Sequence, residues 1–132
     1  MRTLLAAVVL VSGSAASHAQ DDVWKASSNT ATAVTGDITL GTDRIVFANG
    51  ESIRLVPVEG RLGVFKVDPP ANPVLMNGSR LCGEKDVTYV VLAQGSTVSL
   101  FMKVFEGPDV PQEAVADPKP QKGTCAIYSF SR

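Results

Sequence analysis

Short apolar runs, separated by glycines and polar turns, make up most of this sequence. The runs are rich in Val, Ile, Leu, Thr, Phe and Tyr, and apolar and polar residues alternate within several of them. No window of helical length carries a sustained apolar stripe with a period of about 3.6 residues. Because alternation with a period of two is typical of half-buried strands, the sequence predicts an all-β protein with frequent turns.

About eight strands are expected from this pattern. They cover residues 30–34, 37–40, 44–48, 52–58, 61–68, 86–93, 96–105 and 124–132. An open sheet of short strands would leave unpaired edges, and closing or doubling the sheet removes them. The predicted fold is therefore a single small antiparallel β-barrel or sandwich.

The turn in "FANGES" can be predicted in detail. A loop of three residues, 48–50, pairs Ile45 with Ile53, whereas a loop of two residues pairs Ile45 with Arg54. Only the first register gives one face four apolar side chains, namely Ile45, Phe47, Ile53 and Leu55. Because the register of a hairpin is set by keeping one face apolar, we predict the three-residue loop, with Gly50 in the left-handed region.

The strongest hairpin joins residues 86–93 to 96–105 through a turn at Gln94-Gly95. Alternation along the second strand predicts a core face made of Val98, Leu100, Met102 and Val104. The other face carries Phe101, Lys103 and Phe105, and two aromatic rings around a lysine form a candidate interaction surface. The alternative is that a loop covers these three side chains, because aromatic residues are usually buried.

Two proline-rich stretches separate the strands. Residues 69–78 are predicted to form an extended surface connection, since Pro69, Pro70 and Pro73 lack an amide donor. Residues 107–123, called here the proline-rich loop, contain four prolines and many polar residues. A loop of this length in a small domain is usually either functional or mobile.

The first 19 residues have the three-part pattern of a cleaved secretory signal. A single charge, Arg2, precedes an apolar run over residues 4–11, and small residues follow up to Ala19. The run is too short to span a bilayer of about 30 Å as a helix, and an uncleaved anchor is the alternative. We expect a periplasmic or secreted protein with residues 1–19 as signal, a mobile lead-in over 20–29 that docks through Trp24, and a β domain over 30–132.

The two cysteines, Cys82 and Cys125, predict one disulfide. An even number of cysteines in an oxidising compartment is typical of structural disulfides. The alternative is a reactive thiol pair, but the sequence has no CxxC motif and no nearby histidine to lower a thiol pKa.

The only histidine, His18, lies in the signal segment, so the mature chain contains none. This excludes catalysis by Ser-His-Asp or Cys-His groups and the common zinc sites, and we predict no metal, no cofactor and no enzymatic activity. A hydrolase that uses carboxylates such as Glu84 and Asp86 is the remaining enzymatic alternative.

Charge gives further limits on the partners. Removal of the signal with Arg2 changes the formal charge from −1 to −2, and no basic stripe remains. This argues against nucleic acid as a partner. Nothing after the signal is apolar for long enough to span a membrane.

The segments "ANPVLMNGSRLCG" and "TCAIYSFSR" resemble a family of small exported alphaproteobacterial proteins of unknown function. The resemblance covers most of the mature chain but implies no activity. At the level of fold alone, the chain is similar to periplasmic inhibitors of C-type lysozyme, which are also small exported β-barrels with disulfides. Their sequence motifs are not evident here, so no binding residues are carried over.

These observations together predict a non-enzymatic binding or envelope-accessory module with a protein partner in the cell envelope or the host. The alternative is a periplasmic inhibitor of a lysozyme-like hydrolase.

Overall fold

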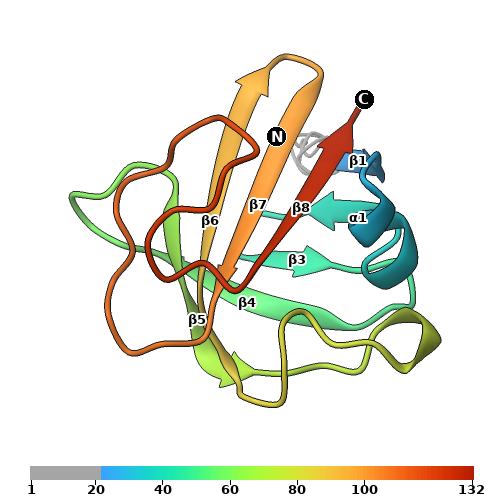
Figure 1. Cartoon of the computed structure of the whole chain (residues 1–132), viewed down its shortest axis with the longest axis horizontal. Coiled ribbons are helices and arrows are strands. Elements are labelled where there is room, and N and C mark those ends of the chain that lie inside the picture. The colour runs from blue at the N-terminus through green and yellow to red at the C-terminus, as the bar shows by residue number, and fades with distance from the viewer. Residues whose placement is uncertain (1–21) are drawn as a thin grey trace, which may run out of the picture.

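The computed structural model describes residues 22–132, which form a closed antiparallel barrel of eight strands. Each strand pairs with the next along the chain, and the last strand pairs with the first (Figure 1). The prediction of an all-β fold is therefore confirmed, and the barrel is found instead of the sandwich. The signal predicted over residues 1–19 lies outside the described residues.

The elements have the following bounds. The strands are β1 (Asp22–Ala26), β2 (Ile38–Leu40), β3 (Arg44–Val46), β4 (Ser52–Pro57), β5 (Val64–Ala71), β6 (Val87–Ser96), β7 (Ser99–Phe105) and β8 (Ala126–Ser131). The helices among residues 22–132 are α1 (Asn29–Val34) and the 3₁₀ turn η2 (Met76–Gly78).

The inward side chains fill the barrel. The cluster contains mainly branched and aromatic residues, among them Trp24, Ile38, Ile45, Ile53, Val67, Val90, Leu100, Met102, Tyr128 and Phe130. All of these side chains are almost completely removed from water. Their burial is the main force that closes the sheet on itself.

One end of the barrel is covered by α1 and by residues 72–86, called here the capping segment. The Nδ2 atom of Asn77 donates to the carbonyl oxygen of Ala33 at 3.0 Å, which joins the capping segment to α1. The Tyr128 hydroxyl donates to the carbonyl oxygen of Leu81 at 2.5 Å. Leu81 is buried in the core cluster, so the capping segment extends the core beyond the strands.

The prediction of a mobile lead-in over residues 20–29 is wrong for its described part, residues 22–29. Residues 22–26 form β1, which pairs with β2 and β8 and closes the barrel. Trp24 is buried as expected, and Val23 and Lys25 point outward. The β domain therefore begins earlier than residue 30. The sequence does not indicate this strand, because a strand with one inward aromatic residue shows little alternation.

The strand predicted over residues 30–34 is also wrong, because this segment forms α1. The Ser28 side chain caps the helix by accepting a hydrogen bond from the Ala31 amide at 3.1 Å. Serine at this position satisfies an amide that the first helical turn leaves free, and alanines favour the helix. The number of strands agrees with the prediction because β1 takes the place of this segment.

The hairpin between β3 and β4 confirms the predicted register. Ile45 is paired with Ile53, and the Phe47 amide donates to the Glu51 carbonyl oxygen at 2.8 Å. Gly50 has a φ of 93°, in the left-handed region, and its amide donates to Phe47 at 2.9 Å. The four apolar residues predicted to share one face are all buried.

The turn between β6 and β7 differs from the predicted Gln94-Gly95. Pairing continues through an irregularity to Ser96 opposite Ser99, so the turn consists of Thr97 and Val98. The Ser96 hydroxyl accepts a hydrogen bond from the Val98 amide at 3.1 Å and stabilises the turn. Val98 is consequently 53% exposed and does not belong to the core, whereas the other predicted inward residues of β7 are buried.

The proline stretch after residue 68 only partly matches the expected connection. Strand β5 continues through Pro69 and Pro70 to Ala71, with a shift of register between Lys66 and Ala71. Both prolines are exposed. An irregular stretch of strand accommodates prolines because no ladder hydrogen bond is required of them there.

Candidate functional site

The proline-rich loop lies against the outer face of the barrel. It leaves β7, passes over β5 and β6, and returns to β8 (orange to red in Figure 1). The Ala114 amide donates to the Leu62 carbonyl oxygen at 3.0 Å, and Arg61 Nη1 donates to the Pro111 carbonyl oxygen at 2.6 Å. The loop is therefore joined to the turn between β4 and β5.

Lys103 anchors the proline-rich loop to β7. It points outward from β7 but is fully buried, because the loop covers it. Its Nζ atom donates to the Val115 carbonyl oxygen at 2.9 Å and to Asp117 Oδ1 and Gln121 Oε1, both at 3.3 Å. An ammonium group has three donors, and here each has an acceptor, which offsets much of the cost of removing the charge from water.

Gln121 organises the rest of the loop. Its Oε1 atom also accepts from the Val115 amide at 3.1 Å, and its Nε2 atom donates to the carbonyl oxygens of Gln112 and Glu113, both at 3.2 Å. One amide side chain therefore connects the two halves of the loop. A polar network in which every member has partners gives a loop one defined shape.

Asp117 stabilises a turn within the proline-rich loop. It accepts a hydrogen bond from the Lys119 amide at 2.9 Å, and this bond, together with Lys103, holds the pKa of Asp117 below its usual 3.8. The carboxylate therefore stays ionised, and available to Lys103, at neutral pH.

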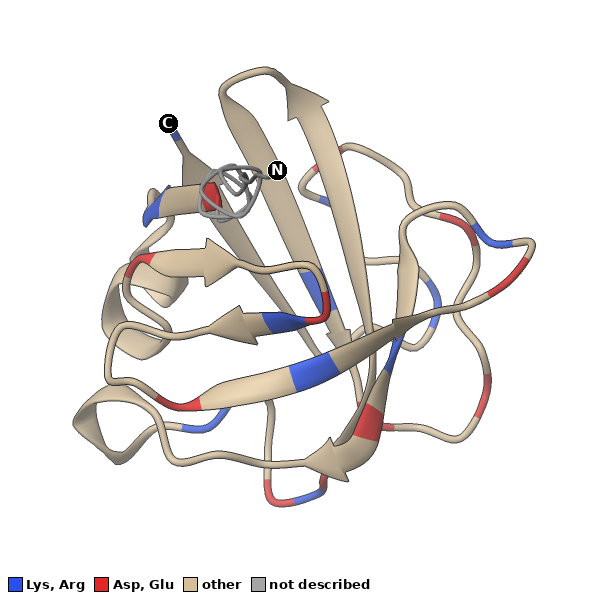
Figure 2. Cartoon of the chain, turned by 180° about the vertical axis from the view of Figure 1, so that it is seen from behind, with Lys and Arg blue, Asp and Glu red and all other residues tan. Residues whose placement is uncertain are grey.

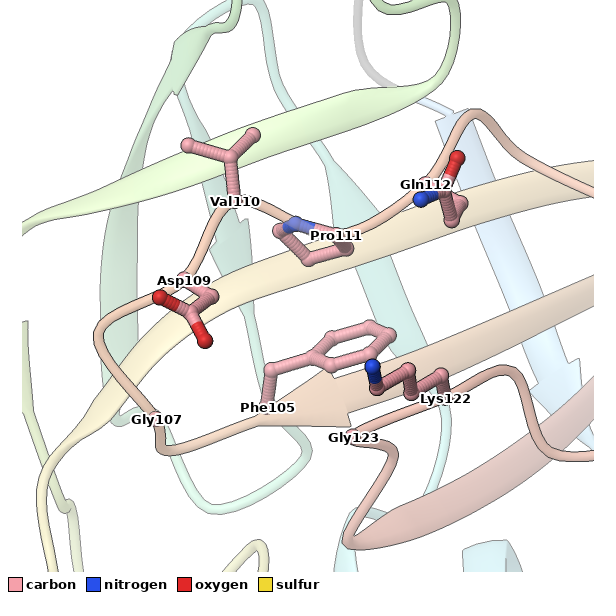
Figure 3. A pocket seen from close by; sticks show the side chains of 8 residues that line it. All are labelled: Phe105, Gly107, Asp109, Val110, Pro111, Gln112, Lys122 and Gly123. Carbon is pink, nitrogen blue, oxygen red and sulfur yellow. The ribbon is translucent and has the colours of Figure 1, made fainter.

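A pocket of about 220 Å³ lies between the two ends of the loop. The ring of Phe105 forms its floor, and Val110 and Pro111 lie above it (Figure 3). Asp109 and Lys122 stand on opposite sides of the ring and carry opposite charges (Figure 3). The pocket thus offers an apolar contact between one acidic and one basic group.

Two further hollows border the same loop. One lies between Glu113 and the turn that follows β4, and the other lies between Ala114, Ala116 and β6. Leu62 lines both, and its side chain is 79% exposed. Because an exposed leucine next to a fixed loop has no role in the core, it marks this region as a candidate contact surface.

The disulfide predicted between Cys82 and Cys125 is confirmed, with a Cα–Cα distance of 5.8 Å. It joins the capping segment to the chain just before β8. A disulfide of this kind is compatible with an exported protein. Among residues 22–132, no helix is long and apolar enough to cross a membrane.

The residues predicted as an interaction surface lie on the outer face of β7, as expected, but most of their surface is covered. Lys103 and Phe105 are buried and Phe101 is half-buried, because the proline-rich loop covers this face of β7. The alternative, that a loop covers these side chains, is therefore confirmed for Lys103 and Phe105, and the prediction of an exposed patch is wrong for both. The exposed surface belongs to the loop above them, and Phe105 contributes only the floor of the pocket.

The carboxylates considered for catalysis are not gathered in a pocket. Glu84 and Asp86 are exposed in the capping segment, and neither lines any of the three hollows described above. Asp43 accepts a hydrogen bond from Arg44 at 3.2 Å, which lowers the pKa of Asp43 in an exposed turn.

Charged residues of both signs are spread over the turns and strands of the barrel (Figure 2). Beside the proline-rich loop, Asp109 and Lys122 line the pocket, and Arg61 and Glu113 line one of the further hollows. The arrangement gives no field of one sign over this face.

Comparison of the chain with family models, curated proteins and solved structures finds no match. The function must therefore be argued from the geometry of the chain.

Proposed function

We propose that this chain is an exported, non-enzymatic binding protein that contacts a protein partner through the proline-rich loop and Leu62. The observation that carries the proposal is the buried Lys103, whose three loop acceptors hold an otherwise irregular segment in one shape. A surface ordered before binding loses less conformational entropy on association. The barrel core, in contrast, is filled with side chains, so the outer face supplies the contacts.

The chemistry of the surface favours a protein as the partner. Leu62, Val110 and Val115 are exposed apolar residues on segments that hydrogen bonds join together. Charges of both signs surround them. An apolar centre with a mixed polar rim is the usual composition of a protein–protein interface, whereas nucleic acid would require a basic surface.

The proposal is tested by crosslinked capture from the native cell envelope followed by mass spectrometry. Leu62→Ser removes the most exposed apolar side chain of the surface, and Val23→Ser makes a similar change on β1, where Val23 is also exposed. We expect the same partner with the wild type and Val23→Ser, and its loss with Leu62→Ser at unchanged melting temperature. Retention of every captured partner by Leu62→Ser contradicts the proposal.

An inhibitor of a lysozyme-like hydrolase is one form that such a binding protein takes. A fixed loop on a rigid barrel favours this form, since inhibitors commonly bind with little change of shape. An assay of C-type lysozyme with micromolar protein tests it. Full lysozyme activity at that concentration excludes the inhibitor function. The more general proposal of a binding protein does not depend on this result.

A further inference from the structure

A carboxylate lies beside the disulfide. Glu106 directly follows β7, and one of its carboxylate oxygens and the sulfur atoms of Cys82 and Cys125 all lie within 4.8 Å of one another. The Oε2 atom of Glu106 is buried and has no hydrogen-bond partner in the structure. A buried oxygen without a partner is costly, so its position next to two sulfurs needs a physical reason.

The three side chains come from separate parts of the chain that other contacts hold in place. Cys125 is held to β7 by its amide, which donates to the Val104 carbonyl oxygen at 2.8 Å. The residue before Cys82, Leu81, is buried and accepts the hydrogen bond of the Tyr128 hydroxyl. These contacts do not involve the bond between the sulfurs, so we expect the two cysteines to stay close together in a reduced chain that remains folded.

A reductant can reach the bond from outside. Cys125 is exposed and Cys82 is half-buried. Thiol–disulfide exchange requires that an external thiolate approach one sulfur in line, and Cys125 is the more exposed residue of the two.

We propose that reduction of the disulfide converts Cys82, Cys125 and Glu106 into a binding site for a thiophilic divalent cation such as Zn²⁺. Two thiolates and one carboxylate supply three ligands, and water takes the fourth position of a tetrahedral site. Sulfurs bound to one tetrahedral zinc ion lie about 3.7 Å apart, so the two sulfurs must separate after reduction. The Cα–Cα distance of 5.8 Å allows both side chains to reach one ion. The metal would give the free oxygen of Glu106 a partner.

The chemistry balances with an external dithiol as reductant. Two electrons from the dithiol break the S–S bond, its two hydrogens protonate the sulfurs of Cys82 and Cys125, and the dithiol becomes a disulfide. Binding of the cation then releases both thiol protons, so affinity rises with pH. In the oxidised chain the sulfurs are not thiolates and Glu106 alone cannot chelate, so binding is confined to the reduced state.

The metal would join the same two segments that the disulfide joins. The ion would connect the capping segment to the start of β8 and would stabilise the reduced chain. The inference is independent of the proposed partner surface, because none of the three ligands lines a hollow beside the proline-rich loop.

The site is tested with Co²⁺ as a spectroscopic probe of the purified protein. A phosphine reduces the disulfide, takes the oxygen of one water molecule to become its oxide, and leaves both thiols free. We expect thiolate-to-cobalt charge-transfer absorption that saturates at one Co²⁺ per reduced chain, and displacement of Co²⁺ by Zn²⁺, which binds such ligands more tightly. Absence of this absorption in the reduced protein, or equal binding by the oxidised protein, overturns the proposal.

Variants separate the carboxylate from the thiols. Glu106→Gln should weaken Zn²⁺ binding by about tenfold or more, since even the groups that only support a ligand contribute that much. Glu84→Gln is the matched control, because Glu84 is exposed and lies two residues from Cys82. Unchanged affinity of Glu106→Gln contradicts a role for this carboxylate.

Stability provides a second measurement if the reduced chain folds poorly. Zn²⁺ should raise the melting temperature of the reduced protein, or restore its β-type circular dichroism spectrum if reduction unfolds it, and should leave the oxidised protein unchanged. A reduced chain that Zn²⁺ neither stabilises nor refolds also overturns the proposal.

Discussion

At the scale of single residues, Lys103 shows how one buried charge determines the shape of a loop. The alternation along β7 correctly placed its side chain on the outer face, but its partners lie 12, 14 and 18 residues further along the chain. Local sequence patterns contain no information on such contacts. The sequence therefore indicates both β7 and the proline-rich loop as candidate surfaces, but it does not show how the loop is fixed over the strand.

Replacement of Lys103 by methionine should loosen the loop. The Lys103→Met side chain has a similar length but donates no hydrogen bond to Val115, Asp117 or Gln121, so we expect a loss of about 1–3 kcal/mol in the free energy of unfolding. Urea denaturation measures the loss, and amide exchange at Val115 and Lys119 should become faster. Lys66→Met on an exposed position of β5 is the control, and equal stability of the two variants contradicts the assigned role.

Gly50 offers a test of backbone conformation alone. A Cβ atom at this position meets no atom within 4 Å, but the φ of 93° disfavours any side chain. Gly50→Ala should therefore lower stability by about 1 kcal/mol. Gly107→Ala is a matched control, because its Cβ also meets no neighbour and its φ lies outside the left-handed region. A melting temperature unchanged by Gly50→Ala would falsify the assigned register.

Tyr128 predicts how stability depends on alkaline pH. Burial raises its pKa to about 12 from the usual 10.0. The unfolded chain therefore loses the hydroxyl proton first, and the stability contributed by Tyr128 is complete below pH 10 and is lost as the pH rises through 12. Urea unfolding across this range should show a smaller loss for Tyr128→Phe than for the wild type. Parallel losses in the two proteins contradict this assignment.

At the scale of elements, the sequence predicted those that local chemistry determines. The predicted register of the hairpin between β3 and β4 is confirmed, because only one register gives four apolar residues a common face. The prediction of a strand over residues 30–34 is wrong. Threonine and alanine alternate there with a strand-like period, but the Ser28 cap favours a helix. Strand β1 was missed because its pairing with β2 and β8, and not its own pattern, makes it a strand.

The disulfide acts at this scale, since it fastens the capping segment to the start of β8. The cysteines are 43 residues apart, and the chain-entropy model gives roughly 4 kcal/mol for a loop of this size. The double variant Cys82→Ser and Cys125→Ser should therefore unfold at a lower urea concentration, with a loss of about 2–4 kcal/mol in metal-free buffer. The reduced wild type should show the same loss, and a double variant as stable as the oxidised protein contradicts the structural role.

At the scale of the whole molecule, the outer face around the proline-rich loop results from contacts between distant segments. Arg61 and Leu62 come from the turn after β4, Phe105 from the end of β7, and the remaining residues from the loop itself. The sequence could indicate the loop by its length and prolines. The pocket and the exposed leucine beside it required the closed barrel, which brings these segments together.

Barrel closure also determines when the chain can fold. The seam consists of β1 against β8, reinforced by Arg132, which lies 4.2 Å from the centre of the Trp24 ring and pairs with Asp22. Strand β1 therefore has both of its neighbours only when residues 126–131 are in place. Closure of the barrel is consequently a late event in folding, because it joins the first and the last strand of the sheet.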